Sequence, residues 1–243
     1  MAQRDTGLID VGSGRQLRYT VVLPDGAPPD GGWPGLIVLF EALGLTPEML
    51  AVADRFAERG WAVYIPDYLS TGTRIGCLIR SGQEIMAGKR GPLTASLTVA
   101  SQHFAGRGDV DATRLAVIGF CLGGSLALLL GSVQELGFRA VASNYGRTPP
   151  ADTLRTSPPV VGSFGGRDRS VAAEPQRLRE RLAACGVAAD IKTYPDAGHS
   201  FLTDGRHPIA SLLMVPMHLG FVADAAQDAW DRIDAWLERY ATR

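Results

Sequence analysis

The sequence has few cysteines and no excess of charge of either sign. Its 243 residues include three cysteines, Cys77, Cys121 and Cys185, and so small and odd a number excludes a disulfide framework. Lysine and arginine number 24 against 25 acidic residues, a formal net charge of −1 that gives no sign of a surface for nucleic acid or another polyanion. We therefore expect a cytoplasmic protein, because a reducing compartment keeps thiols free.

The sequence also lacks the marks of a leader peptide, of a metal site and of a membrane span. The stretch from Met1 to Gly7 has no apolar core of the kind that signal peptides carry. The four histidines do not pair at metal-ligand spacing, so we expect no metal. The uncharged run from Leu115 to Val133 is long enough to span a bilayer, but its glycines at 119, 123 and 124 cluster where a turn is expected. We therefore interpret it as a strand followed by a helix.

Apolar runs and helical segments alternate along the chain. Hydrophobic residues make up 46% of it, enough for a sizeable core in one domain over residues 1–243. This alternation predicts an α/β fold with a mostly parallel sheet covered by helices on both faces. We expect a hairpin over 8–11 and 15–23, strands at 35–40, 61–65, 115–118, 140–143, 160–164 and 190–194, and helices at 49–59, 93–104, 174–184, 224–240 and after Cys121.

Residues 69–91 are rich in glycine and only weakly patterned. Two interpretations stay open for them, an excursion that covers a pocket or a simple loop. They contain Arg74, Arg80 and Arg90, three of the basic side chains that could face a bound ligand.

The chain is organised around the sequence Gly119-Phe-Cys-Leu-Gly123. A β-branched run precedes it and an apolar Leu- and Ala-rich segment follows, which predicts a sharp strand–turn–helix elbow that presents Cys121. Glycine is needed at both ends because a Cβ there would collide with the neighbouring strand or helix. The first turn of the following helix also favours a thiolate.

Four polar residues, Glu41, Cys121, Asp168 and His199, each follow a predicted strand. The chemistry of open α/β sheets gathers at the carboxyl ends of the strands, so we expect these residues to meet there. Their order of nucleophile, acid and histidine is that of α/β-hydrolases. A thiol attacks only as thiolate and needs a base, and an Asp fixes the tautomer of that base. Asp196 is closer to His199 in sequence, but the loop of Asp168 is better suited to reach it.

Four separated motifs resemble the dienelactone hydrolase family: Gly119–Gly124, Gly165-Gly-Arg-Asp168, Ala197-Gly-His-Ser-Phe201 and Glu41-Ala-Leu-Gly44. The resemblance covers nearly the whole chain. It implies an α/β-hydrolase fold without metal or organic cofactor, and a Cys121–Asp168–His199 triad that cleaves an ester or lactone through an acyl-thioester. It also implies that Glu41 contacts the resting thiol and helps to activate it once substrate binds.

The oxyanion formed by the attack needs preorganised donors. By the logic of the elbow, one donor is the backbone N–H of Leu122, directly after the nucleophile, and the other is that of Ala42.

The residues expected to bind the substrate differ from those of the family that the chain resembles. That family holds a substrate carboxylate with arginines, and one of these positions falls here at Thr203, with Arg206 just beyond it. We assign substrate contacts to Tyr145, Phe201 and Arg206. The apolar run over 209–217 is interpreted as core, with an acyl-pocket wall or a partner contact as alternatives.

These observations predict a hydrolase that acts on a small ester or lactone, and a monomer or weak homodimer without nucleic-acid or membrane partners. Two alternatives stay open. The fold could bind a small molecule or sense redox state through its thiol without catalysis, or it could transfer the acyl group to an acceptor other than water.

Overall fold

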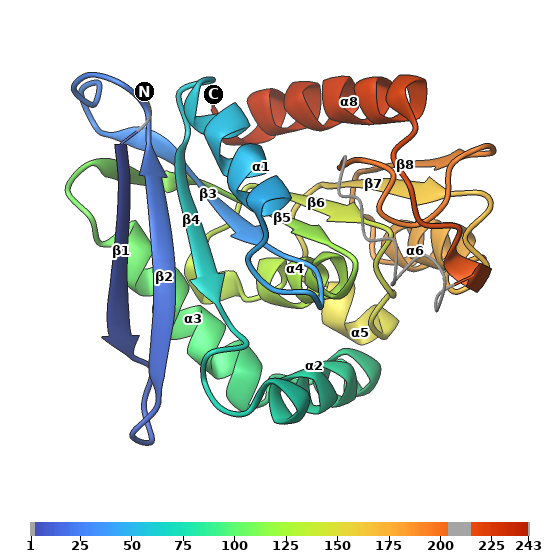
Figure 1. Cartoon of the computed structure of the whole chain (residues 1–243), viewed down its shortest axis with the longest axis horizontal. Helices are drawn as coiled ribbons and strands as arrows, with labels where there is room; N and C mark the ends of the chain where they lie inside the picture. The colour runs from blue at the N-terminus through green and yellow to red at the C-terminus, as the bar shows by residue number, and fades with distance from the viewer. Residues whose placement is uncertain (1–2, 204–214, 243) are drawn as a thin grey trace.

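The structure is a computed structural model and describes residues 3–203 and 215–242. Its strands form one open sheet in the order β1-β2-β4-β3-β5-β6-β7-β8 (Figure 1). The strands from β4 through β3 to β8 run parallel, and β2 joins β1 and β4 in antiparallel pairs. The bounds are β1 (Gln3–Asp10), β2 (Gln16–Leu23), β3 (Trp33–Leu39), β4 (Ala62–Asp67), β5 (Val110–Phe120), β6 (Ala140–Asn144), β7 (Val160–Gly165) and β8 (Ala189–Tyr194).

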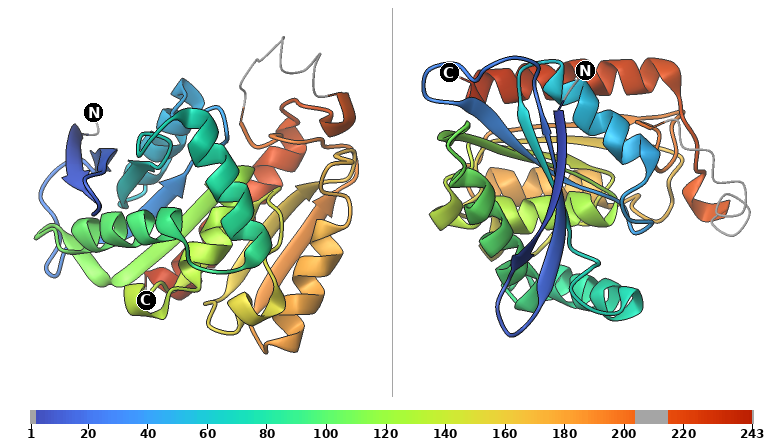
Figure 2. Two further views of the ribbon diagram at one scale, coloured as in Figure 1. Left: turned by 90° about the horizontal axis from the view of Figure 1, so that it is seen from below. Right: turned by 60° about the vertical axis from the view of Figure 1, so that its left-hand side comes forward.

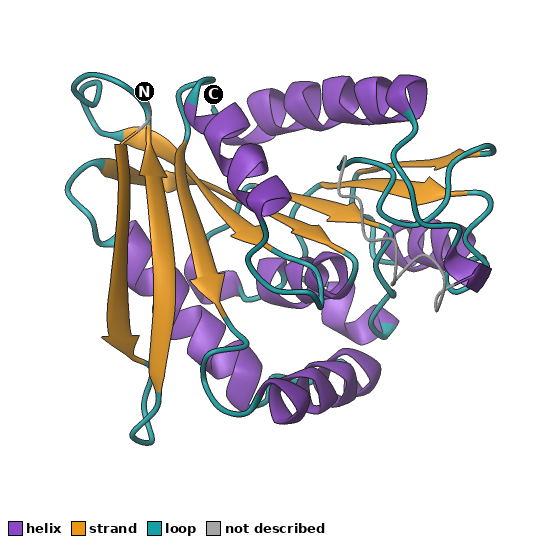
Figure 3. Cartoon of the chain, in the orientation of Figure 1, coloured by secondary structure: helices purple, strands orange, loops and turns teal. Residues whose placement is uncertain are grey.

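Helices cover both faces of this sheet, as Figures 1 and 3 show. Helices α1 and α8 pack on one face, and α3, α4 and α6 pack on the other, which Figure 2 shows from below. The predicted α/β class with a mostly parallel sheet is therefore confirmed. The helices are α1 (Pro47–Ala57), α2 (Arg74–Ala87), α3 (Pro92–Ala105), α4 (Leu122–Gly131), α5 (Ala151–Leu154), α6 (Glu174–Ala184) and α8 (Ala223–Ala241), with short 3-10 turns η1 (Gln134–Leu136) and η2 (Val215–Met217).

The central strands are those with continuous apolar runs. Every residue of β3 is buried, and so is the second half of β5, because helices cover both faces. Strand β1 starts at Gln3, earlier than the expected Leu8. It is an edge strand whose residues are mostly exposed, so no hydrophobic pattern marks its beginning. Among the described residues, no helix is long and apolar enough to cross a membrane.

Residues 74–87 form helix α2, within the segment that is only weakly patterned in sequence. The side chain of Thr73 caps the helix by accepting a hydrogen bond from Gly76 N at 3.3 Å, and Gly88 ends it in the left-handed conformation with φ of 60°. The sequence hid this helix because its outer face is apolar as well. Ile75 is 72% exposed and Ile79 56% exposed, which blurs the expected amphipathic pattern.

A buried carboxylate fastens α2 to α3. Glu84 on α2 accepts backbone hydrogen bonds from Leu93 N (2.8 Å), Thr94 N (2.9 Å) and Gly91 N (3.2 Å), and another from the Thr94 hydroxyl (2.6 Å). The first amides of α3 have no partners within their own helix, so Glu84 serves as their cap.

Replacing Glu84 with glutamine should lower the free energy of unfolding by about 1–3 kcal/mol, because a neutral amide accepts these bonds less well and brings unwanted donors. Urea denaturation measures the loss. Glu135→Gln is the matched control, since Glu135 pairs with Arg90 at the exposed surface and its loss should leave the free energy of unfolding unchanged. Equal stability of Glu84→Gln and wild type would contradict the capping role.

Candidate active site

Cys121 occupies the sharp turn between β5 and α4. Its backbone angles are φ 54° and ψ −116°, a strained conformation for a residue with a side chain. The turn is held by a hydrogen bond from Cys121 N to Asn144 O at 3.0 Å, which ties it to the end of β6. Such strain at a strand–helix elbow lifts the central side chain clear of the sheet.

The glycines around Cys121 are required by close backbone contacts. A Cβ on Gly119 would overlap the carbonyl of Gly123, and one on Gly123 would overlap the carbonyl of Leu39 on the neighbouring strand. The expectation that both ends of the motif need glycine is therefore confirmed.

The histidine and the acid meet at the same edge of the sheet. Asp168 follows β7, His199 follows β8, and His199 Nδ1 lies 2.5 Å from Asp168 Oδ2. The other oxygen of Asp168 accepts bonds from Ser170 N (2.9 Å) and Ser170 Oγ (2.6 Å). Burial acts to raise the pKa of Asp168, but the bonds from His199 and Ser170 outweigh it and hold the pKa below its usual value. The partner of His199 is thus Asp168, and not the alternative Asp196.

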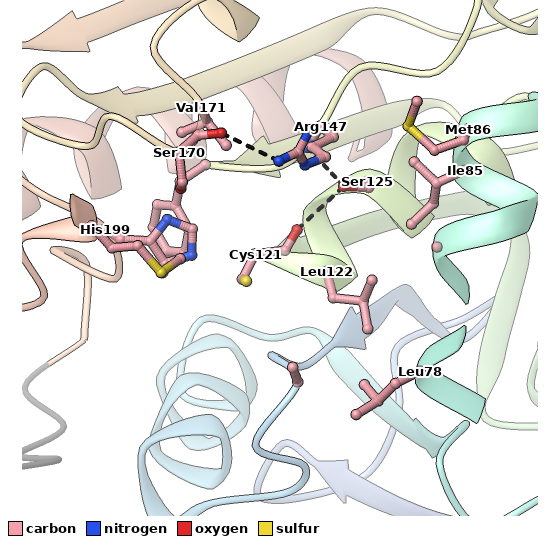
Figure 4. Close-up of a pocket in the computed structure, with 14 residues that line it drawn as sticks. Leu78, Ile85, Met86, Cys121, Leu122, Ser125, Arg147, Ser170, Val171 and His199 are labelled. Atoms are coloured by element: carbon pink, nitrogen blue, oxygen red, sulfur yellow. Dashed lines mark hydrogen bonds between the residues drawn. The ribbon is translucent and has the colours of Figure 1, made fainter. Parts of the chain in front are cut away.

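The second ring nitrogen of His199 faces the thiol. His199 is 3% exposed, and its Nε2 has no hydrogen-bond partner among the described residues. Figure 4 shows the Cys121 side chain pointing toward the imidazole, and both line one cavity. Burial acts to lower the pKa of His199, but Asp168 and the nearby Cys121 outweigh it and raise the pKa to about 10. The ring therefore carries its proton at neutral pH.

Glu41 follows β3, and its carboxylate is bonded to two hydroxyl groups. Its Oε1 accepts hydrogen bonds from Ser200 Oγ at 2.8 Å and from the Tyr145 hydroxyl at 3.3 Å. Burial and the charge of Glu41 raise the pKa of Tyr145, so the phenol stays protonated and donates. The expected contact between Glu41 and the resting thiol is not among the described hydrogen bonds. The carboxylate of Glu41 accepts hydrogen bonds from these two hydroxyl groups instead.

The two expected oxyanion donors lie beside the nucleophile. Leu122 begins α4, Ala42 follows β3, and both line the cavity with Cys121. Strand β3 pairs with β5 so that Leu39 is opposite Gly119, which brings the chain after β3 next to the elbow. Within the described chain, neither the Leu122 nor the Ala42 amide donates to a protein acceptor. Both N–H groups are free to stabilise a developing negative charge.

A cavity of about 560 Å³ opens over Cys121 (Figure 4). Helix α2 supplies much of its apolar wall, through Leu78, Ile85 and Met86. Arg147, three residues beyond β6, supplies the one guanidinium among the described residues that line it. Arg147 was not predicted from the sequence, although its position just after a strand end was a usable signal. The lining residues are Ala42, Leu78, Gly82, Ile85, Met86, Cys121, Leu122, Ser125, Tyr145, Arg147, Ser170, Val171, His199 and Met217.

The three residues expected to contact the substrate differ in where they lie relative to the cavity. Tyr145 lines the cavity. Phe201 does not: it is fully buried, with its ring centroid 5.9 Å from that of Tyr145 and 5.1 Å from that of Tyr194, so it packs in the core. We withdraw its assignment to substrate. Arg206 lies outside the described residues. Of the apolar run over 209–217, residues 209–214 also lie outside them, and Met217 lines the cavity.

The arginines of the segment over 69–91 are engaged elsewhere. Arg74 donates to Ala42 O at 2.9 Å, Arg80 donates to Gly76 O at 3.2 Å, and Arg90 pairs with Glu135. None of the three is among the cavity-lining residues of the described chain.

The mostly parallel sheet, with an elbow after β5 and an acid and a histidine after later strands, defines a protein of the α/β-hydrolase fold. The chain belongs to the dienelactone hydrolase family, whose model matches residues 19–241.

Individual relatives agree with that membership. The chain is 28% identical over 226 residues to the carboxymethylenebutenolidase of Rhodococcus opacus, covering 87% of this chain and 83% of that one. Among solved structures, it is similar to dienelactone hydrolase from Anabaena variabilis (TM-score 0.67, 19% identity, 99% of each chain). It is also similar to a dienelactone hydrolase-like promiscuous phosphotriesterase from metagenomic libraries (TM-score 0.81, 19% identity, 98% of each chain). At these identities the two structures show the fold alone.

Proposed function

We propose that this protein hydrolyses a small carboxylic ester or lactone, with Cys121 as the nucleophile and an acyl-thioester as the intermediate. One observation carries the proposal. His199 Nδ1 is bonded to the buried Asp168, while its Nε2 is left without a protein partner on the side of Cys121. A histidine fixed at one nitrogen and free at the other is suited to proton transfer with the thiol and the leaving group.

The proposed reaction has two halves. The Cys121 thiolate attacks the carbonyl carbon, a C–S bond forms, and the negative charge on the carbonyl oxygen is held by the N–H groups of Leu122 and Ala42. The C–O bond then breaks, and the leaving alkoxide takes a proton from His199 Nε2. A water molecule, giving its proton to His199, attacks the thioester and releases the acid and the thiolate. Asp168 holds the ring in place throughout.

Two further supports come from the chain and its relatives. The chain is similar to the carboxymethylenebutenolidase of Rhodococcus opacus, and a butenolide is a lactone, so the same reaction class is proposed here. The helix that begins at Leu122 also directs the positive end of its dipole toward the sulfur. We propose that Glu41, held by Ser200 and Tyr145 in this structure, takes part in activating the thiol once substrate binds.

Trapping the intermediate tests the proposal. The protein is mixed with p-nitrophenyl acetate, quenched in acid during turnover, digested and mapped by mass spectrometry. We expect one acetyl group on Cys121 and none on Cys77 or Cys185, lost again on treatment with hydroxylamine. Steady release of both products with no acyl-Cys121 would contradict the cysteine mechanism. No release from any ester or lactone tried would contradict the hydrolase, and product that appears only with an added thiol or alcohol would indicate acyl transfer.

A further inference from the structure

One side of helix α2 forms a wall of the cavity over the nucleophilic turn. The residues of α2 that line this cavity are Leu78, Gly82, Ile85 and Met86. They lie at positions i, i+4, i+7 and i+8, so they share one side of the helix. None of the four has a charged or strongly polar side chain, and Arg147, which also lines the cavity, comes from the loop after β6. The wall that α2 provides is therefore suited to an apolar part of a ligand.

Gly82 lies in the middle of α2, although neither packing nor backbone conformation requires a glycine there. A glycine inside a helix makes that helix less stable than an alanine would. In α4, by contrast, a Cβ on Gly123 would overlap the backbone of β3, and one on Gly131 would overlap the Val141 side chain. A Cβ on Gly82 would meet no atom within 4 Å, and its φ is not positive. The open space beside Gly82 is part of the cavity that it lines.

The acyl part of an ester bound at Cys121 extends toward α2. In the proposed reaction the leaving alkoxide takes its proton from His199 Nε2, so the alcohol part of the ester lies beside His199. Figure 4 shows His199 on one side of Cys121, and Leu78 and Ile85 of α2 on the opposite side. The acyl chain is therefore directed into the part of the cavity that α2 walls.

We propose that this part of the cavity binds the apolar acyl chain of an uncharged ester, and that Gly82 determines how large a chain it accepts. The inference rests on the proposed ester hydrolysis at Cys121. The chain would pass Gly82 and Ile85 toward Met86, which is 68% exposed and stands at the opening of the cavity. From Leu78 to Met86 the helix rises by about 12 Å, at about 1.5 Å per residue, so a chain of several methylenes can lie along it.

The test measures kcat/KM for p-nitrophenyl esters from acetate to decanoate, each kept below the concentration at which it forms micelles. In wild type, kcat/KM should rise about threefold for each added methylene until the cavity is filled, because each buried methylene leaves water. Gly82→Leu should lower the ratio of kcat/KM for octanoate to that for acetate at least tenfold, because its side chain takes the space of several methylenes. Gly82→Ala should lower the same ratio about threefold.

Stability and a matched variant separate loss of space from damage to the fold. Alanine favours a helix over glycine and its Cβ would meet open space, so Gly82→Ala should melt about 2–4 °C above wild type. Gly82→Leu should melt no lower than wild type for the same reason. Gln83→Leu is the control, because Gln83 is the next residue of α2, is exposed, and is not among the described residues that line the cavity. This variant should keep the wild-type ratio.

Two outcomes would overturn the inference while leaving hydrolysis intact: no rise of kcat/KM with chain length in wild type, or an equal ratio in Gly82→Leu and wild type. If no ester is hydrolysed, the hydrolase proposal fails, and binding decides the acyl site. The probe is then the methyl ketone that carries the octanoyl chain, an uncharged compound that cannot be hydrolysed. Calorimetry should give a Kd at least tenfold weaker for Gly82→Leu than for wild type. Equal affinity would contradict the site.

Discussion

Replacing Cys121 with alanine is expected to reduce kcat/KM for an activated ester by about 10⁴-fold or more. The residual cavity and the free amides of Leu122 and Ala42 still bind and polarise the ester, but no atom is left to form the covalent bond. The rate of p-nitrophenol release, followed at saturating and limiting substrate, measures the loss.

Two further variants sharpen this result. Cys121→Ser should retain a small fraction of the activity, because a hydroxyl is a much weaker nucleophile than a thiolate at the same position. Cys185→Ala is the control: Cys185 caps the end of α6, and its sulfur donates to the Ala151 carbonyl oxygen at 3.4 Å, far along the chain from the elbow. Full activity in Cys121→Ala would show that the sulfur has no catalytic part.

Replacing His199 with glutamine is expected to lower kcat/KM by about 10³-fold, since no group is then left to carry the proton between the thiol and the leaving group.

The charge on the His199 ring also makes the free energy of unfolding depend on pH. Below pH 6.5 the ring is protonated in both the folded and the unfolded chain. Between pH 6.5 and about 10 only the folded chain keeps the proton, so unfolding releases it.

The free energy of unfolding should therefore decline as pH rises through this window, by at most about 1.4 kcal/mol per pH unit for this one group. Urea denaturation at a series of pH values measures the slope. Subtracting the slope of His199→Gln removes the contribution of other groups that titrate in the same range. An unchanged slope in His199→Gln would contradict the raised pKa, and unimpaired turnover by this variant would contradict its catalytic role.

The local sequence pattern was sufficient to predict the strands of the sheet and the turn at Cys121. A strand such as β3 is buried on both faces, so its continuous apolar run identifies it without knowledge of its neighbours. Gly119 and Gly123 are demanded by backbone contacts within the turn and with the adjacent strand, which is why their spacing around Cys121 indicated the turn. Helix α6 was predicted with its observed bounds, because its apolar positions recur at helical spacing.

The acid and the histidine were predictable for a related reason. In a parallel sheet all the strands end at one edge, so residues that follow strands are gathered there whatever their distance in sequence. For this reason we expected Asp168 to lie beside His199. In the structure, Asp168 Oδ2 lies 2.5 Å from His199 Nδ1.

The sequence by itself determined the layered fold, the family and the edge of the sheet where polar side chains meet, because each depends on a local pattern or on strand order. Only the tertiary structure decided which side chains face the cavity. Tyr145 lines it and Phe201 packs behind it, although both are aromatic residues after a strand. Arg147 faces the cavity and Arg74 does not, because the direction of a long side chain depends on the elements packed around it.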